Sequence, residues 1–243
     1  MAIGDGDGDG DGDNSTVNKS CVLSFIGKAT WCKHDYFVAQ PYNSVAIVSV
    51  SDNDYSAYLA RNADDDLQKL PAFAKTIMQQ LGENLERIQG LGVKRIAVIL
   101  IEPMGCVPLQ AASSSYTNCS EVLNLGSKFH NQMLKQALKN LNDKSNSTVF
   151  VTLDLYNVFI SALNKLRKRA SGSLGMKNPL KPCCEGKEKG KYYCGSMDES
   201  GAKQYGICEN PNLSLFWDTV HPSQNGWHTI FSSLRSSLHT FIT

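Results

Sequence analysis

The sequence predicts an α/β protein of three layers, in which a parallel sheet lies between helices. Two observations support this class. Short β-rich apolar runs alternate with longer segments whose apolar residues recur every three or four positions. Each intervening segment is long enough to hold the helix that a parallel crossover requires. The chain has 243 residues, of which 42% are hydrophobic, and this suffices for one large domain with its own core.

Three runs are predicted as strands: residues 45–50, 95–101 and 149–153. The first reads VAIVSV, a continuous run of the kind expected for a strand buried on both faces. Pro103 follows the second run and stops it. A stable doubly wound sheet usually has about five strands, and the first 40 residues do not supply two more. We therefore expect a sheet that lacks its N-terminal strands.

Four amphipathic segments are predicted as helices. The first opens at Pro71 and ends at Gly90 and Gly92, and the last begins near Ser223. Each carries an apolar face at spacings of three and four, which is expected to pack on the sheet. The faces are Phe73, Ile77, Met78, Leu81, Leu85 and Ile88; Val122, Leu125, Phe129, Met133, Leu134, Leu138 and Leu141; Phe159, Leu163 and Leu166; and Trp227, Ile230, Phe231, Leu234 and Leu238.

The N-terminus differs in composition from the rest of the chain. Residues 1–20 contain a Gly/Asp repeat, and disorder is expected there because both residues disfavour regular structure and the acids repel one another. One domain is expected over residues 21–243. The opening residues lack the basic and apolar regions of a signal peptide. No run is long enough to span a bilayer. The repeat resembles the start of a calcium loop, but Thr16 stands where that loop needs glutamate.

Eight cysteines indicate disulfides and a secretory route. Their number is even, and four of them lie in a loop rich in Gly and Lys over residues 172–212. Zinc binding is a weaker alternative, because two cysteines are adjacent and no C-x-x-C pair exists. The four C-terminal cysteines allow three pairings, whereas Cys106 has Cys119 as its nearest partner. The cysteines are Cys21, Cys32, Cys106, Cys119, Cys183, Cys184, Cys194 and Cys208.

Charge and sequons give weaker indications of partners and location. The net charge is +1, so nothing in the balance of charge favours nucleic acid or an anionic membrane surface. Asn-x-Ser/Thr sequons are acceptors for glycosylation in secreted proteins, although they are common by chance. They stand at Asn14, Asn18, Asn118, Asn146 and Asn212.

Asp218 and His221 are the first candidates for chemistry. They stand in LFWDTVHP, ahead of the last predicted helix. A serine hydrolase uses a histidine to take the proton of its nucleophile and a carboxylate to orient that histidine. A gap of three residues across a tight turn lets both side chains face the same way. On spacing alone, however, a turn aspartate and a surface histidine are the commoner explanation.

Two further blocks directly follow predicted strands. Asn53 lies in SDNDY after the first strand, where its amide could donate to an oxyanion or simply form a polar turn. Residues 102–108, EPMGCVP, follow the second strand and predict a rigid turn held by a disulfide. In parallel sheets such loops at the carboxyl ends of strands carry the chemistry.

Together the blocks SDNDYSAYL, EPMGCVP, CCEG…YYCG…ICENP and LFWDTVHPSQNGW resemble the plant GDSL-type esterase/lipase branch of the SGNH hydrolases. They occur in family order from about residue 44 to the end. The resemblance implies a flavodoxin-like α/β/α sandwich and hydrolysis of acyl esters. It implies His221 as general base, Asp218 as its orienting acid and Asn53 as an oxyanion donor. It also implies disulfides at Cys106, Cys119, Cys183, Cys184, Cys194 and Cys208, glycosylation and secretion.

The resemblance is incomplete at the N-terminus. The family's G-D-S-L block, which supplies the serine nucleophile, is not found, and Ser51 replaces the glycine of the Asn53 block. The implied enzyme is a monomer that acts on a small-molecule or lipid ester and needs no metal or other cofactor. Two alternatives remain open: an inactive relative that binds acyl or glycan esters, and a chain that does not fold stably alone. A loss of the nucleophile typically lowers turnover about a millionfold.

Overall fold

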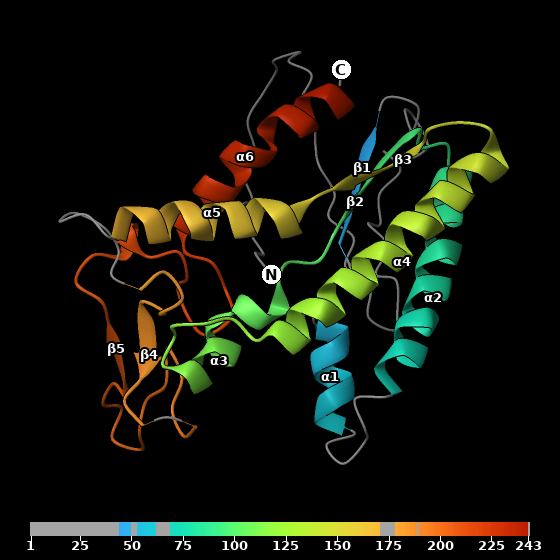
Figure 1. The fold of residues 1–243 in the computed structure, drawn as a ribbon. Coiled ribbons are helices and arrows are strands. Elements are labelled where there is room, and N and C mark those ends of the chain that lie inside the picture. Colours follow the sequence, from blue (N-terminus) through green and yellow to red (C-terminus); the bar gives the residue numbers. More distant parts are fainter. Residues whose placement is uncertain (1–43, 50–52, 62–68, 171–177, 189, 243) are drawn as a thin grey trace, which may run out of the picture.

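The computed structural model describes residues 44–49, 53–61, 69–170, 178–188 and 190–242. The predicted disorder of residues 1–20, Cys21, Cys32 and the sequons at Asn14 and Asn18 lie outside these ranges. Within them, a parallel sheet of three strands is covered by helices on both faces, and the predicted three-layer α/β/α class is confirmed (Figure 1).

The sheet consists of β1 (Val45–Ser49), β2 (Arg95–Ile99) and β3 (Phe150–Leu153) in the order β1-β2-β3. Both pairs are parallel, with Val48 opposite Val98 and Val98 opposite Thr152. All three strands therefore end at the same edge of the sheet. The predicted strand 95–101 is two residues too long. Leu100 N–H still donates to the carbonyl of Leu153, but both backbone groups of Ile101 bond to the side chain of Asn131 instead of a neighbouring strand.

Helices α2 (Leu70–Gly90) and α4 (Glu121–Ser145) cover one face of the sheet. Pro71 stands in the first turn of α2, and the helix ends at Gly90 as predicted. The core between these helices and the sheet is built from alternate strand residues that point to this face. Its members include Val48, Met78, Leu81, Leu85, Ile88, Ile96, Val98, Leu100, Leu134, Leu138 and Phe150.

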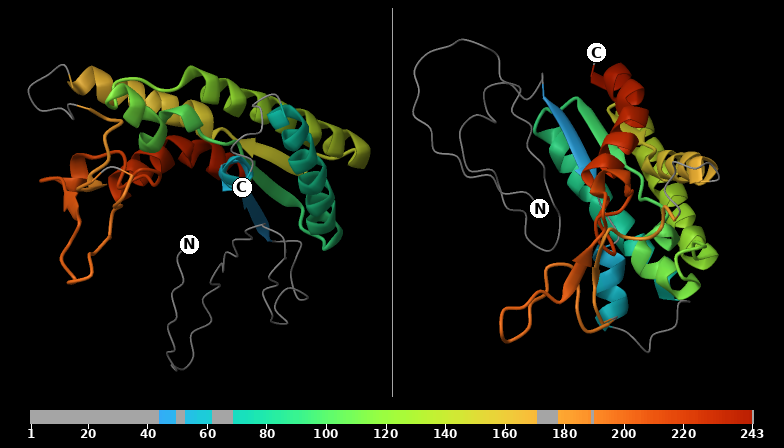
Figure 2. Two further views of the ribbon diagram at one scale, coloured as in Figure 1. Left: turned by 90° about the horizontal axis from the view of Figure 1, so that it is seen from below. Right: turned by 90° about the vertical axis from the view of Figure 1, so that its left-hand side faces the viewer.

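Helix α6 (Gln224–Ile242) contacts β2 and β3 from the opposite face, and α5 (Leu155–Ala170) packs against α6. Their core joins Phe159, Leu163 and Ile230 to Phe216 and to the loop after β2. In this loop, η4 (Met104–Cys106), α3 (Pro108–Ala111) and η5 (Ala112–Ser114) follow one another. Figure 2 shows the two helical layers on either side of the strands.

Three predicted apolar faces are wrong in part. In β1, Ile47 is 39% exposed rather than buried on both faces, because β1 is an edge strand among the described residues and α6 contacts β2 and β3 instead. In α6, Trp227 and Phe231 are half exposed, whereas Ile230 is buried. In α4, the apolar residues of the first two turns face solvent, and polar ones are buried in their place. The exposed residues of α4 are Val122, Leu125 and Phe129.

Two segments predicted as loops hold regular structure. Helix α1 (Asn53–Arg61) occupies the block that was expected to be a polar turn. The cysteine-rich region contains an antiparallel hairpin of β4 (Cys184–Gly186) and β5 (Tyr205–Ile207), followed by η6 (Pro211–Leu213). The hairpin stands at the opposite end of the molecule from α2 (Figures 1 and 2).

Candidate functional site

Asp218 and His221 form a hydrogen-bonded pair in the turn that precedes α6. The imidazole Nδ1 of His221 lies 2.8 Å from Oδ2 and 3.1 Å from Oδ1 of Asp218. Oδ1 also accepts hydrogen bonds from the backbone N–H groups of Val220, at 2.8 Å, and His221, at 2.7 Å. The aspartate thus caps its own turn and orients the ring three residues later. The Asp218 side chain is 24% exposed and the His221 side chain 75%, so the imidazole faces solvent.

The pKa of Asp218 lies below its ordinary value. Desolvation by burial would raise this pKa, but the backbone N–H groups of His221 and Val220, together with the His221 ring, outweigh it. The carboxylate is therefore held in the ionised form that accepts a hydrogen bond from Nδ1–H. That hydrogen bond selects the tautomer in which Nε2 is free to accept a proton.

The turn is held from three sides by backbone hydrogen bonds. Trp217 N–H donates to the carbonyl of His221 at 2.8 Å, which closes the turn on itself. Cys184 N–H donates to the carbonyl of Trp217 at 2.7 Å, so the disulfide-bonded hairpin supports the turn directly. Leu109 N–H donates to the carbonyl of Thr219 at 2.8 Å, which ties the turn to the loop after β2.

Asn53, the predicted oxyanion donor, is the first residue of α1 and is exposed. Ser51 lies outside the described residues. Helix α1 is fixed by Tyr55, whose hydroxyl shares a 2.7 Å hydrogen bond with Nδ1 of His130 on α4. Tyr55 also packs edge-to-face on Phe73 of α2, with ring centroids 5.7 Å apart. Helix α1 is linked to the loop after β2 through α4, and the Asp218 turn is linked to the same loop through Leu109.

A polar stripe on α4 makes this link, and the sequence analysis missed it. Asn131 accepts from Ile101 N–H and donates to the Ile101 carbonyl, both at 2.9 Å. Ser127 accepts from Met104 N–H at 3.1 Å, and Asn124 accepts from Gly105 N–H at 3.0 Å. A Cβ on Gly105 would lie 2.0 Å from a backbone carbonyl oxygen, so the loop packs against its neighbours at a distance that only glycine permits.

Three disulfides are present among the described residues. Cys106 pairs with Cys119 as expected from proximity, and the open choice among the other four resolves to Cys183–Cys208 and Cys184–Cys194. The last two clamp the hairpin that supports the Asp218 turn. The predicted sequons at Asn118, Asn146 and Asn212 are all exposed.

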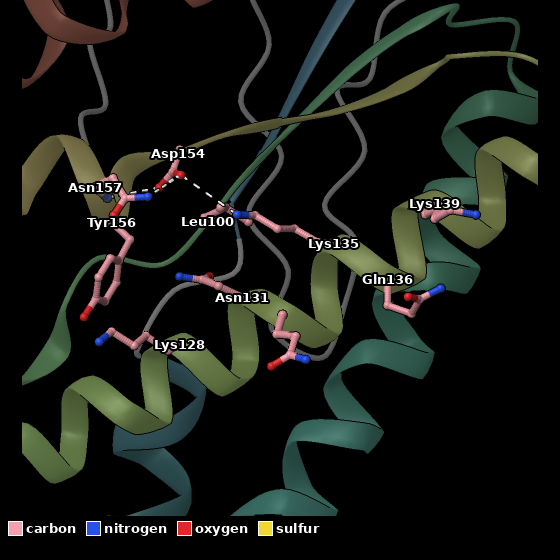
Figure 3. A pocket seen from close by; sticks show the side chains of 10 residues that line it. Leu100, Lys128, Asn131, Lys135, Gln136, Lys139, Asp154, Tyr156 and Asn157 are labelled. Atoms are coloured by element: carbon pink, nitrogen blue, oxygen red, sulfur yellow. Dashed lines mark hydrogen bonds and ion pairs between the residues drawn. The ribbon is translucent and has the colours of Figure 1, made fainter.

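An open groove of about 470 Å³ lies away from the Asp218 turn, between α4 and the start of α5 (Figure 3). Lys128, Lys135, Asp154 and Tyr156 are among its lining residues, and none comes from residues 214–223. No cluster of three or more metal-ligating side chains occurs in the described ranges. No helix in the part of the chain that the structure describes is long and apolar enough to cross a lipid bilayer.

Comparison with known proteins identifies the family. The model of the family described as GDSL-like Lipase/Acylhydrolase matches residues 14–234. Among curated relatives from Arabidopsis thaliana, GDSL esterase/lipase At5g03610 is 41% identical over 84% of this chain and 55% of its own length. GDSL esterase/lipase At3g09930 is 39% identical over 81% of this chain and 54% of its own. The chain therefore spans about half the length of these relatives. It belongs to the GDSL-like lipase/acylhydrolase family.

Proposed function

We propose that this chain carries the acid–base part of a carboxylic ester hydrolase site. The single observation behind this proposal is the hydrogen bond between His221 Nδ1 and the ionised Asp218. It leaves Nε2, on a solvent-facing ring, as the atom that would take a proton from a nucleophile. The family's matched relatives are named esterases/lipases, which supports ester hydrolysis as the reaction.

In the proposed reaction a serine hydroxyl attacks the ester carbonyl while His221 takes its proton. Asn53 donates to the oxyanion of the tetrahedral intermediate, and His221 then returns the proton to the departing alcohol. Water, deprotonated by the same ring, releases the acid. The serine itself is not assigned, and among the described residues no serine hydroxyl is hydrogen-bonded to the His221 ring.

Hydrolysis of a chromogenic short-chain ester tests the proposal. If the chain is active, His221→Ala is expected to lower turnover about 10⁴- to 10⁶-fold. His228→Ala is the matched control, because His228 lies in α6 outside the turn, and its activity should equal that of the parent. Equal activity of the His221 variant would exclude His221 as the base. Labelling with a serine-directed fluorophosphonate, followed by peptide mapping, would identify the nucleophile.

The alternative is an inactive relative that binds esters, and the unassigned nucleophile favours it. A sample that unfolds cooperatively, hydrolyses no ester and takes no fluorophosphonate label, but binds a non-hydrolysable ester analogue, would establish this alternative. A sample with no cooperative unfolding transition would instead show that the chain is not stable alone.

We further propose that the protein is secreted and glycosylated. The three disulfides support an oxidising compartment, and the exposure of Asn118, Asn146 and Asn212 makes those sequons accessible. Expression through a eukaryotic secretory route, with and without glycosidase treatment, tests this. No change in mass at any of the three asparagines would contradict it.

A further inference from the structure

The groove between α4 and the start of α5 shares no lining residue with α1 or with the Asp218 turn. Leu100 follows β2 and Asp154 follows β3, so the groove lies at the carboxyl ends of two neighbouring parallel strands. In open α/β sheets this edge is where ligands bind. Its volume of about 470 Å³ is in the range of sites for small molecules.

One end of the groove holds an exposed cation and a tyrosine hydroxyl. The Tyr156 ring is largely buried, whereas its hydroxyl reaches solvent and makes no hydrogen bond to protein within the described ranges. Lys128 faces it, with Nζ 6.0 Å from the centre of the Tyr156 ring, and has no carboxylate partner there. Figure 3 shows both groups directed to the same side of the groove. A cation and a hydroxyl donor on the same side of the groove, with no acceptor from the described protein, are able to hold an anionic group between them.

The other end is polar but balanced in charge. Lys135 Nζ lies 3.9 Å from Oδ2 of Asp154, and the Asn157 amide donates to the same oxygen at 2.7 Å. Lys139 is paired with Asp143 at 2.6 Å. A carboxylate, amides and a neutralised lysine offer donors and acceptors but no net charge, and this set suits the hydroxyl groups of a ligand.

We propose that this groove binds a small hydroxylated anion of the size of one or two sugar rings. Its carboxylate or phosphate would lie between Lys128 and Tyr156, and its hydroxyls would bond to Asp154, Asn157 and Gln132. From Lys128 to Lys135 the helix rises roughly 10 Å, which is about the length of such a molecule.

Amide chemical shifts of isotope-labelled protein, titrated with D-glucuronate and glucose 6-phosphate, test the proposal without any catalytic readout. Shifts are expected at Lys128, Gln132, Tyr156 and Asn157, with weaker binding of neutral glucose and of inorganic phosphate. Lys128→Gln should weaken binding roughly tenfold or more, and Tyr156→Phe by a smaller factor.

Lys144→Gln is the matched control. Lys144 is another exposed lysine of α4, but it pairs with Glu86 at 2.7 Å and does not line the groove. Its substitution should leave the affinity unchanged. If the Lys128 and Lys144 variants weakened ligand binding equally, the effect would come from the overall charge of the protein, and the proposal would be overturned. It would also fail if inorganic phosphate bound as tightly as the sugar phosphate, or if no resonance moved.

Discussion

Asp218 owes its low pKa to hydrogen bonds that its own turn supplies, and this links acid stability to the proposed base. A carboxyl group whose folded pKa is depressed stabilises the fold above its unfolded value of 3.8. The contribution is lost as the pH falls through the lower, folded value. The turn that orients His221 is therefore expected to persist through mildly acidic conditions and to loosen only in stronger acid.

His130 is expected to make the stability of the fold depend on pH in the acidic range. Burial lowers its pKa from 6.5 to about 4, so the folded state keeps the ring neutral while the unfolded chain takes up a proton. The contribution of neutral His130 to the free energy of unfolding is therefore fully present above pH 6.5, and it is lost as the pH falls toward 4. The loss is about 3 kcal/mol, from about 1.4 kcal/mol for each unit of pKa shift.

The double variant Tyr55→Phe/His130→Phe removes the imidazole that titrates. It also removes the Tyr55 hydroxyl, which would otherwise be left without its hydrogen-bond partner. Urea unfolding at pH 7 and pH 4.5 measures the effect. The free energy of unfolding should fall more steeply with acid in the parent than in the variant. Parallel losses in the two proteins would show that His130 is not the group that titrates.

Helix α4 shows how far the sequence predicted an element and where it stopped. The position of the helix and the burial of Leu134 and Leu138 followed from the spacing of apolar residues. For the first turns of α4 the sequence predicted the wrong buried face. The periodicity rule places apolar residues inward, and it contains no information about backbone groups of a distant loop that need polar partners. Those groups need partners once buried, and Asn124, Ser127 and Asn131 supply them. A row of polar residues at helical spacing was the available signal.

Asn131→Leu tests the importance of that polar stripe. The change leaves the N–H and C=O of Ile101 buried without partners, and each such group costs about 1–3 kcal/mol. We expect a loss of about 2–5 kcal/mol in the free energy of unfolding, measured in urea. Asn140→Leu, an exposed change on the same helix, should stay within about 0.5 kcal/mol. A similar small effect at Asn131 would contradict the assigned role.

The start of α6 depends on one glycine. A Cβ at Gly226 would lie 2.1 Å from the backbone oxygen of Leu215, in the segment that leads to the Asp218 turn. Gly226→Ala must displace the helix or that segment and should destabilise the protein by more than about 1 kcal/mol. Gly82→Ala, in α2 with nothing near the added atom, should stabilise it by up to about 1 kcal/mol. Thermal unfolding of both variants distinguishes them, and a stabilising Gly226 change would refute the close contact.

For the molecule as a whole, the sequence predicted the class, the three strands and the acid–histidine pair, because each depends on local pattern. Helix α1 was missed because Asn53 and Asp54 are typical of turns, and its fixed position depends on Tyr55 contacting distant partners. The disulfide partners of Cys183 and Cys184 could not be predicted from the sequence either. Adjacent cysteines offer no local reason to prefer one partner, and the choice depends on the register of the β4–β5 hairpin.

This hairpin divides the molecule into parts held by different forces. The layers around the sheet rest on buried apolar side chains. The hairpin strands bury only Cys184, and they are closed by Cys183–Cys208 and Cys184–Cys194. Such a segment is expected to open locally, below the free energy of global unfolding, when its cross-links are removed.

Limited proteolysis with trypsin measures that opening. In Cys184→Ser/Cys194→Ser, cleavage after Lys191 and Lys203 should accelerate roughly tenfold or more. Cleavage after Lys144, at the end of α4, should keep the parent rate because that helix packs on the sheet core. The backbone N–H of Cys184 also donates to the carbonyl of Trp217, so opening of the hairpin should loosen the Asp218 turn. Hydrogen exchange at the amides of Val220 and His221 should therefore be faster in the same variant. Unchanged exchange there would mean that the turn keeps its geometry without the hairpin, held by Leu109 and its own closing hydrogen bond.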